Sequence, residues 1–336
     1  MGKLISGKSM EDMSMKKWLK RSITILLVAA FALQMFGCGS KQAASSETGI
    51  HLNIAIQPVP GYVPLYVLRD QGWLTDALKE QSVDINFTEF EAGPPENESF
   101  AAGQQDIGVM GNVPSISGIA AGQNRAIIGI SYNGEQANAT LVVKDSSIQS
   151  LEDLKGKKVG LVVGSIAENL LNTQLQSVGL NEKDVELVNL STGEQATALA
   201  QGQVDAVTTW EPSITKIQSS KDTRILADGT GLFKGENTIV ADASYVKEHP
   251  QIVKIFLEQY EKAAKEVEEH PEEIAKTYAK QFGVSEEEFV SALSHVDFPI
   301  AISEDDVTDL QKTADFLYES GIVSQKLQIK DYVVNP

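Results

Sequence analysis

The residues that could do chemistry in this chain stand where strand-like segments turn into helices. The run VGLVVGSIAENLL is typical, because a hydrophobic strand is predicted to end at Val163, Gly164 makes the turn and Ser165 precedes an amphipathic helix. The Ser165 hydroxyl can cap that helix, or it can face an anion together with the free N–H groups of the first turn. Both interpretations, helix capping and anion binding, fit this sequence.

Four further turns place polar, aromatic or glycine residues at the carboxyl end of a predicted strand. Trp210 could form the wall of an apolar or cationic site and Glu211 could accept from an amine, although a core tryptophan and a surface glutamate give the same pattern. The runs IQPVPGYVPLY, VMGNVPSIS, VTTWEPSI and SYNGEQANAT contribute Gln57, Tyr62, Gly111, Asn112, Trp210, Glu211 and Asn138.

Residue types that catalyse reactions do not form a recognisable motif in this sequence. The sequence has no His-Glu-x-x-His run, no Gly-x-Ser-x-Gly elbow and no phosphate-binding Gly-x-x-x-x-Gly-Lys loop. Its four histidines are His51, His249, His270 and His295, and none has the spacing of a metal-ligand pair. The sequence therefore predicts a binding protein with no cofactor and no metal.

The elements that must position these turns alternate between strand and helix from residue 50 to about 250. HLNIAIQ reads as a strand and PLYVLRDQGWL as a helix, and the alternation continues in this way. Such alternation predicts an α/β fold with mostly parallel sheets covered by helices on both faces, and ligands bind beyond the carboxyl ends of such strands.

The chain from Gln251 onward is predicted to be helical. QIVKIFLEQYEKAAKEVEEH is an amphipathic helix, and the last helix opens with a capping pair, Ser303 and Asp306. The many Glu and Lys residues of these helices are expected to be solvated faces rather than a binding surface.

Residues 1–37 are predicted to be an export signal. An apolar run of about fourteen residues follows a basic cluster, which suits a signal peptide and is too short to span a bilayer. The only cysteine, Cys38, follows Gly37 as in a bacterial lipoprotein box, so we expect it to be acylated, with residues 38–49 as a flexible tether. An ordinary signal peptide with a chance cysteine is the alternative.

The net charge of the chain limits the kinds of partner that it can bind. Residues 1–37 hold six of the 28 basic and two of the 46 acidic side chains, so residues 38–336 carry a net charge of −22. A chain this acidic is not expected to bind nucleic acid, and anionic lipid would repel it. Attachment to a membrane would therefore come from the acyl chains.

Three longer motifs resemble the alkanesulfonate-, taurine- and nitrate-binding receptors of ABC importers. AGPPENESFAAGQQDIGVMGNVPSISGIAAGQ, SLEDLKGKKVGLVVGSIAENLL and ALAQGQVDAVTTWEP stand in the family's order and spacing and cover roughly residues 50–250. The resemblance implies a solute-binding lipoprotein with the type II periplasmic-binding-protein-like fold, in which two α/β lobes trap a ligand. It also implies that the cleft is lined by Gln57, Tyr62, Gly111, Asn112, Gly164, Ser165, Trp210 and Glu211, to which we add Asn138 beside the predicted lobe crossing.

This interpretation assigns residues 50–138 and 236–336 to the first lobe and residues 139–235 to the second. We expect a monomer, anchored by lipid on the extracytoplasmic face of the cell membrane, that delivers a small-molecule ligand to an ABC permease. The ligand is predicted to be an alkanesulfonate, taurine or nitrate, even though the turns contain no Lys or Arg. The alternatives are a receptor for a small heterocycle such as a thiamine-type pyrimidine, a pyrimidine-related enzyme on the same fold, and a structural lipoprotein or adhesin.

Overall fold

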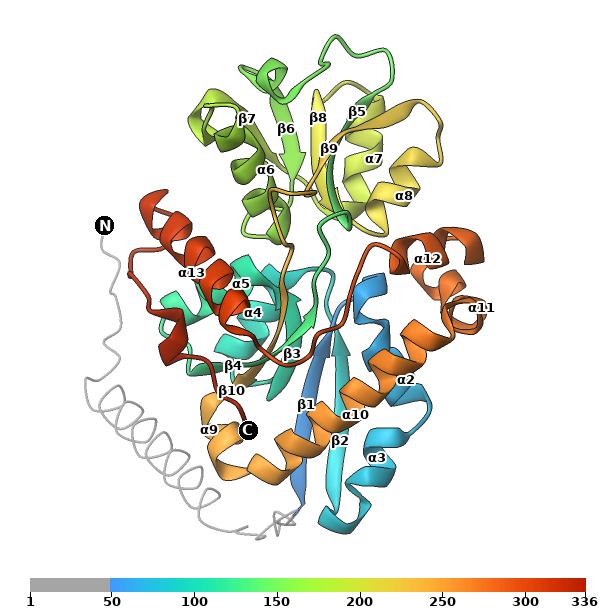
Figure 1. Ribbon diagram of the computed structural model, residues 1–336, viewed down its shortest axis with the longest axis vertical. Coiled ribbons are helices and arrows are strands. Elements are labelled where there is room, and N and C mark those ends of the chain that lie inside the picture. Colours follow the sequence, from blue (N-terminus) through green and yellow to red (C-terminus); the bar gives the residue numbers. More distant parts are fainter. Residues whose placement is uncertain (1–48) are drawn as a thin grey trace, which may run out of the picture. The chain divides into compact units, whose positions relative to one another are not determined.

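The computed structural model describes residues 49–336, which form two α/β lobes, each built on one five-stranded sheet (Figure 1). The predicted export signal and Cys38 lie outside these residues. The first sheet has the order β2-β1-β3-β10-β4 and consists of β1 (Ile50–Ile56), β2 (Val83–Glu89), β3 (Ile107–Gly111), β4 (Arg125–Tyr132) and β10 (Asn237–Asp242). The second has the order β7-β6-β8-β5-β9 and consists of β5 (Asn138–Val143), β6 (Lys158–Leu161), β7 (Glu186–Asn189), β8 (Ala206–Trp210) and β9 (Thr223–Asp228).

One strand in each sheet runs against its neighbours. These strands, β10 and β5, are antiparallel to both of the strands that they pair with. Each is the first strand that the chain forms after it crosses from the other lobe, through residues 133–137 or 229–236. A chain that crosses between lobes arrives at the edge where the other strands end, so its first strand must run backwards. The sheets are therefore mixed, with parallel strands in the majority as the alternation predicted.

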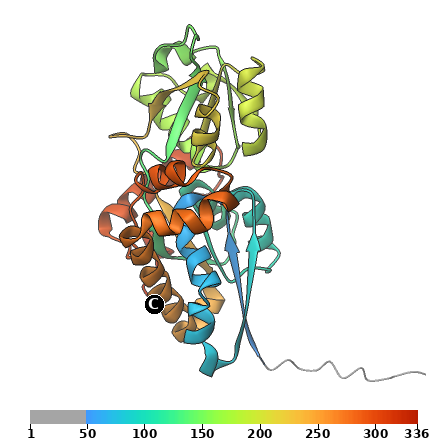
Figure 2. The ribbon, with the colours of Figure 1, turned by 90° about the vertical axis from the view of Figure 1, so that its right-hand side faces the viewer.

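Helices cover both faces of the first sheet. Because successive strand residues point to opposite faces, Ile54 and Ala55 belong to different hydrophobic clusters. The cluster of Ile54 includes side chains of α2 (Val63–Asp70) and α10 (Pro250–Glu269), and the cluster of Ala55 includes α4 (Gly93–Ala101), α5 (Asn112–Ala120) and α13 (Glu304–Glu319). Figure 2 shows the C-terminal helices packed around this lobe. The remaining helices of the lobe are α3 (Trp73–Ala77), α9 (Ala243–Glu248), α11 (Pro271–Phe282) and α12 (Glu286–Leu293).

The second sheet is covered in the same way. Its core divides between α6 (Ile166–Ser177) on one face and α7 (Thr192–Ala200) with α8 (Ser213–Gln218) on the other. Every residue of β3, β4 and β8 is buried, as expected for strands of a sheet that is covered by helices on both faces. The predicted capping pair also forms, because Ser303 and Asp306 close a capping box at the start of α13.

The described residues contain neither a membrane-spanning helix nor a cluster of metal-ligand side chains. Within residues 49–336 no helix combines the length and the apolar character needed to cross a bilayer. In the same residues no three His, Cys, Asp or Glu side chains come together as metal ligands could.

Candidate functional site

The carboxyl edges of the two sheets meet around a small cavity between the lobes, which we call the central cavity. Its volume is about 20 Å³, room for about one water molecule. The first lobe and the second lobe both contribute to its walls, which consist of Gln57, Val59, Tyr62, Gly93, Gly111, Pro114, Tyr132, Ser165, Ile166, Trp210 and Asn237.

Close contact between the lobes keeps this cavity small. A Cβ atom built on Gly111 of the first lobe would lie 2.9 Å from the Cβ of Ile166 in the second. Only glycine at position 111 therefore lets the two surfaces meet at this distance. An organic ligand is larger than the cavity, so the lobes must separate to admit it.

An aromatic pair forms the wall on the first lobe. The rings of Tyr62 and Tyr132 meet edge to face with their centroids 5.1 Å apart. The Tyr62 hydroxyl donates to the side-chain oxygen of Asn237 at 2.5 Å. Burial raises the pKa of Tyr62 well above its usual value, so the phenol stays neutral and presents no charge to the cavity.

Gln57 is held in this wall by a buried carboxyl group. Its Nε2 donates to Glu96 Oε2 at 2.7 Å and to the carbonyl of Val109 at 3.2 Å. Glu96 lies on α4 and is fully buried, and this desolvation raises its pKa to about 8 against the opposing effects of Gln57 and Arg125. The carboxyl group beside the cavity is therefore largely protonated at pH 7.

Ser165 closes the cavity from the second lobe and caps α6. Strand β6 ends at Leu161, two residues before the predicted end, and Gly164 takes the left-handed φ of +77° that the turn requires. The Ser165 hydroxyl accepts from the N–H of Ala167 at 3.2 Å and donates to the carbonyl of Val162 at 2.6 Å. Helix capping thus uses the hydroxyl group, and the N–H of Glu168 donates to the carbonyl of Ser165 at 3.2 Å. Of the first three residues of α6, Ile166 is the one that lies in the cavity wall and whose N–H is not engaged by this cap.

Of the predicted residues Trp210, Glu211 and Asn138, only Trp210 lines the central cavity. Asn138 was expected to end the first lobe, but it begins β5 of the second sheet. Trp210 ends β8 and its side chain lines the central cavity. Glu211 lies outside that wall, because its carboxylate accepts from the N–H of Thr215 at 3.2 Å, and burial raises its pKa. Asn138 pairs with Trp210 in the sheet and donates to the carbonyl of Gly134 at 2.9 Å, where it supports the crossing rather than the cavity.

Asn112 also lies outside the wall of the central cavity. It is fully buried, and its Nδ2 donates to Glu236 Oε2 at 3.1 Å. The cavity thus gathers five of the predicted residues, Gln57, Tyr62, Gly111, Ser165 and Trp210, and leaves out Asn112, Asn138, Gly164 and Glu211.

Sequence reasoning missed Tyr132 and Asn237 for a geometric reason. Tyr132 ends β4, but a crossing segment rather than a helix follows it. Asn237 begins β10, and only because β10 is reversed does its first residue lie at the edge where the other strands end. A search for strand-to-helix turns finds neither residue.

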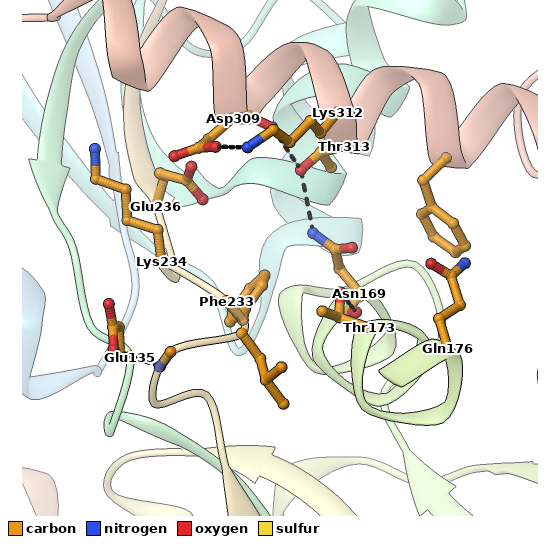
Figure 3. Close-up of a pocket in the computed structure, with 13 residues that line it drawn as sticks. Glu135, Asn169, Thr173, Gln176, Phe233, Lys234, Glu236, Asp309, Lys312 and Thr313 are labelled. Carbon is orange, nitrogen blue, oxygen red and sulfur yellow. Dashed lines mark hydrogen bonds and ion pairs between the residues drawn. The ribbon is translucent and has the colours of Figure 1, made fainter. Parts of the chain in front are cut away.

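A second and larger cavity lies to the side of the lobe junction, between α6, α13 and the returning crossing segment (Figure 3). We call it the lateral pocket. Its volume is about 410 Å³, and its walls consist of Glu135, Asn169, Thr173, Gln176, Gly231, Leu232, Phe233, Lys234, Glu236, Asp309, Lys312, Thr313 and Phe316.

Known proteins resemble this chain over most of its length. A family model described as NMT1/THI5 like matches residues 59–274. A Bacillus subtilis (strain 168) protein, named as a candidate aliphatic sulfonates-binding protein, is 33% identical over 94% of this chain and 95% of its own length. An Escherichia coli (strain K12) protein with the same description is 30% identical over 75% of this chain and 80% of its own length.

Solved structures share the arrangement of the two lobes. The alkanesulfonate-binding protein SsuA from Xanthomonas axonopodis pv. citri, bound to MOPS, has a TM-score of 0.79 at 26% identity and covers 85% of this chain and 98% of its own. The aliphatic sulphonate-binding SsuA from Escherichia coli has a TM-score of 0.76 at 27% identity, with 84% and 97% covered. The desulfurization enzyme DSZB has the same fold, with a TM-score of 0.65 at 17% identity over 85% of this chain and 96% of its own, so the fold alone does not separate binding from catalysis.

Proposed function

This chain belongs to the NMT1/THI5-like family, and on that premise we propose that it captures a small aliphatic sulfonate in the central cavity. It is a solute-binding protein of the ABC-importer type. The predicted resemblance to alkanesulfonate- and taurine-binding receptors is confirmed, and so is the predicted two-lobed α/β fold.

The composition of the central cavity is the observation that carries the sulfonate proposal. Its walls combine aromatic and aliphatic side chains with the neutral polar groups of Gln57, Ser165 and Asn237, and among residues 49–336 no Lys or Arg lines it. The apolar surfaces suit a hydrocarbon chain. The N–H of Ile166 at the start of α6 suits an anionic head, since a helix N-terminus binds anions without a countercharge.

The protonation of Glu96 supports the same ligand. An ionised carboxylate behind Gln57 would repel a sulfonate, but burial raises the pKa of Glu96 to about 8 and keeps most of it neutral at pH 7. The site can therefore accept a negative charge without a lysine or arginine.

A small heterocycle such as a thiamine-type pyrimidine is the second candidate ligand. Tyr62, Tyr132 and Trp210 provide three aromatic surfaces around one cavity, and flat rings stack well on such surfaces. The relatives that match most of the chain are named as binding proteins, so we propose that either ligand is returned unchanged.

Isothermal titration calorimetry on the purified full-length protein tests the ligand class. The panel contains ethanesulfonate, taurine, nitrate and a 4-aminopyrimidine, each followed afterwards by NMR for chemical change. We expect ethanesulfonate to bind and to remain intact. Binding of the pyrimidine alone would replace the sulfonate proposal, and consumption of any ligand would replace the receptor by an enzyme.

The attachment to the membrane is a separate proposal that concerns residues outside the described range. We propose that Cys38 carries the lipid anchor and that the protein, as a monomer on the extracytoplasmic face, passes its ligand to an ABC permease. Cys38→Ala is expected to move the protein from the membrane fraction to the soluble fraction. Retention of this variant in the membrane would contradict the anchor.

A further inference from the structure

The lateral pocket has the properties of a second ligand site. Small-molecule sites typically have volumes of about 300–1,000 Å³, a range that includes the lateral pocket at about 410 Å³. None of the residues in its walls lines the central cavity. Its chemistry can therefore be considered independently of the sulfonate proposal.

Glu236 supplies the polar group that points to a ligand. Its side chain lies in the wall of the pocket with only 2% of its surface exposed. Oε2 accepts from Asn112 at 3.1 Å, but Oε1 has no hydrogen-bond partner among residues 49–336. A buried carboxylate oxygen without a donor is costly, and here burial raises the pKa of Glu236 to about 7.

The lysines of the pocket do not provide the missing donor. Lys234 pairs with Asp306, and Lys312 Nζ lies 2.6 Å from Asp309 Oδ1. Figure 3 shows the Lys312–Asp309 pair on α13 above Glu236. Because each lysine already has an acidic partner, neither Glu236 nor Glu135 of this wall forms an ion pair among residues 49–336. Glu135 accepts from the N–H of Gly231 at 3.0 Å and is exposed, so Glu236 is the buried acid whose second oxygen has no donor.

The rest of the wall indicates what kind of cation would fit. Phe233 and Phe316 offer apolar surface and aromatic faces, which attract organic cations. The side chains of Asn169, Thr173 and Gln176 provide hydrogen-bonding groups on α6. We propose that the lateral pocket binds a small organic ammonium ion whose N–H donates to Glu236 Oε1.

Occupancy of this pocket would also act on the lobes. Asn169 on α6 belongs to the second lobe and donates to Thr313 Oγ1 on α13 of the first at 3.2 Å. A ligand between these helices contacts both lobes and so stabilises the arrangement in which the central cavity is too small for an organic ligand. This second step rests on the proposed function, because it expects ammonium and sulfonate to weaken each other's binding.

Calorimetry with n-butylammonium chloride tests the site, using the full-length protein at pH 8 with potassium chloride as the salt control. We expect one binding site, with affinity at least tenfold weaker in Glu236→Gln and unchanged in Glu319→Gln, which removes an exposed charge at the far end of α13. Equal affinity in wild type and Glu236→Gln, or displacement of the ligand by potassium ions, would overturn the proposal.

A second variant, Gln176→Lys, tests the site independently in case Glu236→Gln does not fold. Gln176 is exposed at the mouth of the pocket, so Gln176→Lys places a positive charge there without disturbing the core. Butylammonium affinity is expected to fall several-fold in this variant, and an unchanged affinity would overturn the site.

The coupling has its own measurement. Ethanesulfonate is titrated with and without saturating butylammonium, and we expect several-fold weaker ethanesulfonate binding in its presence, an effect lost in Glu236→Gln. Butylammonium binding that leaves the ethanesulfonate affinity unchanged would overturn the coupling but not the lateral site. Absence of ethanesulfonate binding under all conditions would instead refute the proposed function, since butylammonium binding is measured alone.

Discussion

The central cavity and the lateral pocket lie beside each other at the lobe junction, yet they are built in opposite ways. The central cavity is formed by strand ends, has neutral walls and measures about 20 Å³, whereas helix faces and a crossing segment form the charged lateral pocket of about 410 Å³. Asn237 faces the first and its neighbour Glu236 faces the second. An organic ligand can therefore enter the central cavity only when the lobes separate, whereas the lateral pocket has room for one while the lobes are together.

Keeping the lobes apart should produce the largest structural effect. Gly111→Val places side-chain atoms where the Cβ of Ile166 lies 2.9 Å from the position of a new Cβ, so the lobes cannot meet as they do in this structure. We expect small-angle scattering of the ligand-free variant to show a larger radius of gyration, and ethanesulfonate to bind at least as tightly as in the wild type, because the sulfonate already requires separated lobes. The matched control is Gly193→Ala, where an added Cβ meets no atom within 4 Å. A loss of ethanesulfonate affinity in Gly111→Val would mean that the sulfonate complex needs the contact between Gly111 and Ile166.

Removing the aromatic wall should separate the two cavities. Trp210→Ala deletes a side chain that lines the central cavity and is absent from the lateral pocket. We expect ethanesulfonate affinity to fall at least tenfold, about 1.4 kcal/mol, while butylammonium affinity measured alone stays within twofold. Because the side chain is largely buried, the free energy of unfolding should also drop, by about 3–5 kcal/mol in chemical denaturation. A parallel loss for both ligands would show that the cavities are not independent.

The fold could be predicted from the sequence because its signals are local. Alternating apolar strands and amphipathic helices report burial directly, so both sheets and the run of C-terminal helices follow from periodicity. The reversal of β5 and β10 is not local, since it depends on where the chain enters each lobe. That reversal is why Asn237, at the beginning of a strand, was missed.

The site was predicted in part for a similar reason. A residue at the end of a strand or directly after it must lie at the carboxyl edge, so Gln57, Gly111 and Trp210 could be found from sequence. Whether a polar side chain faces the ligand or the backbone is decided by contacts with distant segments, and Asn112 turns to Glu236 for this reason. The lateral pocket escaped prediction because Asp309 and Lys312 look like an ordinary solvated helix face.

The pH dependence of sulfonate binding tests whether the wall of the central cavity must stay neutral. Above pH 8 Glu96 ionises and places a negative charge behind Gln57, so ethanesulfonate affinity should fall about fivefold between pH 7 and pH 9, about 1 kcal/mol. Burial raises the pKa of Glu96 from 4.5 to about 8, so the folded state holds the proton more tightly than the unfolded chain. The free energy of unfolding should therefore decrease as the pH rises from about 4.5 to about 8.

Glu96→Gln is the variant that tests this assignment. It should remove both the drop in sulfonate affinity and that part of the pH dependence of stability, as measured by calorimetry and by urea denaturation across the pH range. Glu98→Gln, on the exposed side of the same helix, should leave both profiles as in the wild type. If Glu96→Gln kept the wild-type profile, another group would have to set the pH dependence.

Ser165→Ala should give the smallest change in affinity, and it decides between the two interpretations of this residue. The hydroxyl is engaged by the N–H of Ala167 and the carbonyl of Val162, so the helix loses its cap when the oxygen is removed. We expect the free energy of unfolding to fall by about 1 kcal/mol in urea denaturation, while ethanesulfonate affinity stays within about twofold because the backbone N–H of Ile166 in the cavity wall is retained. A tenfold loss of affinity at unchanged stability would mean the reverse, that the hydroxyl leaves its capping position to bind the sulfonate when the lobes close on it.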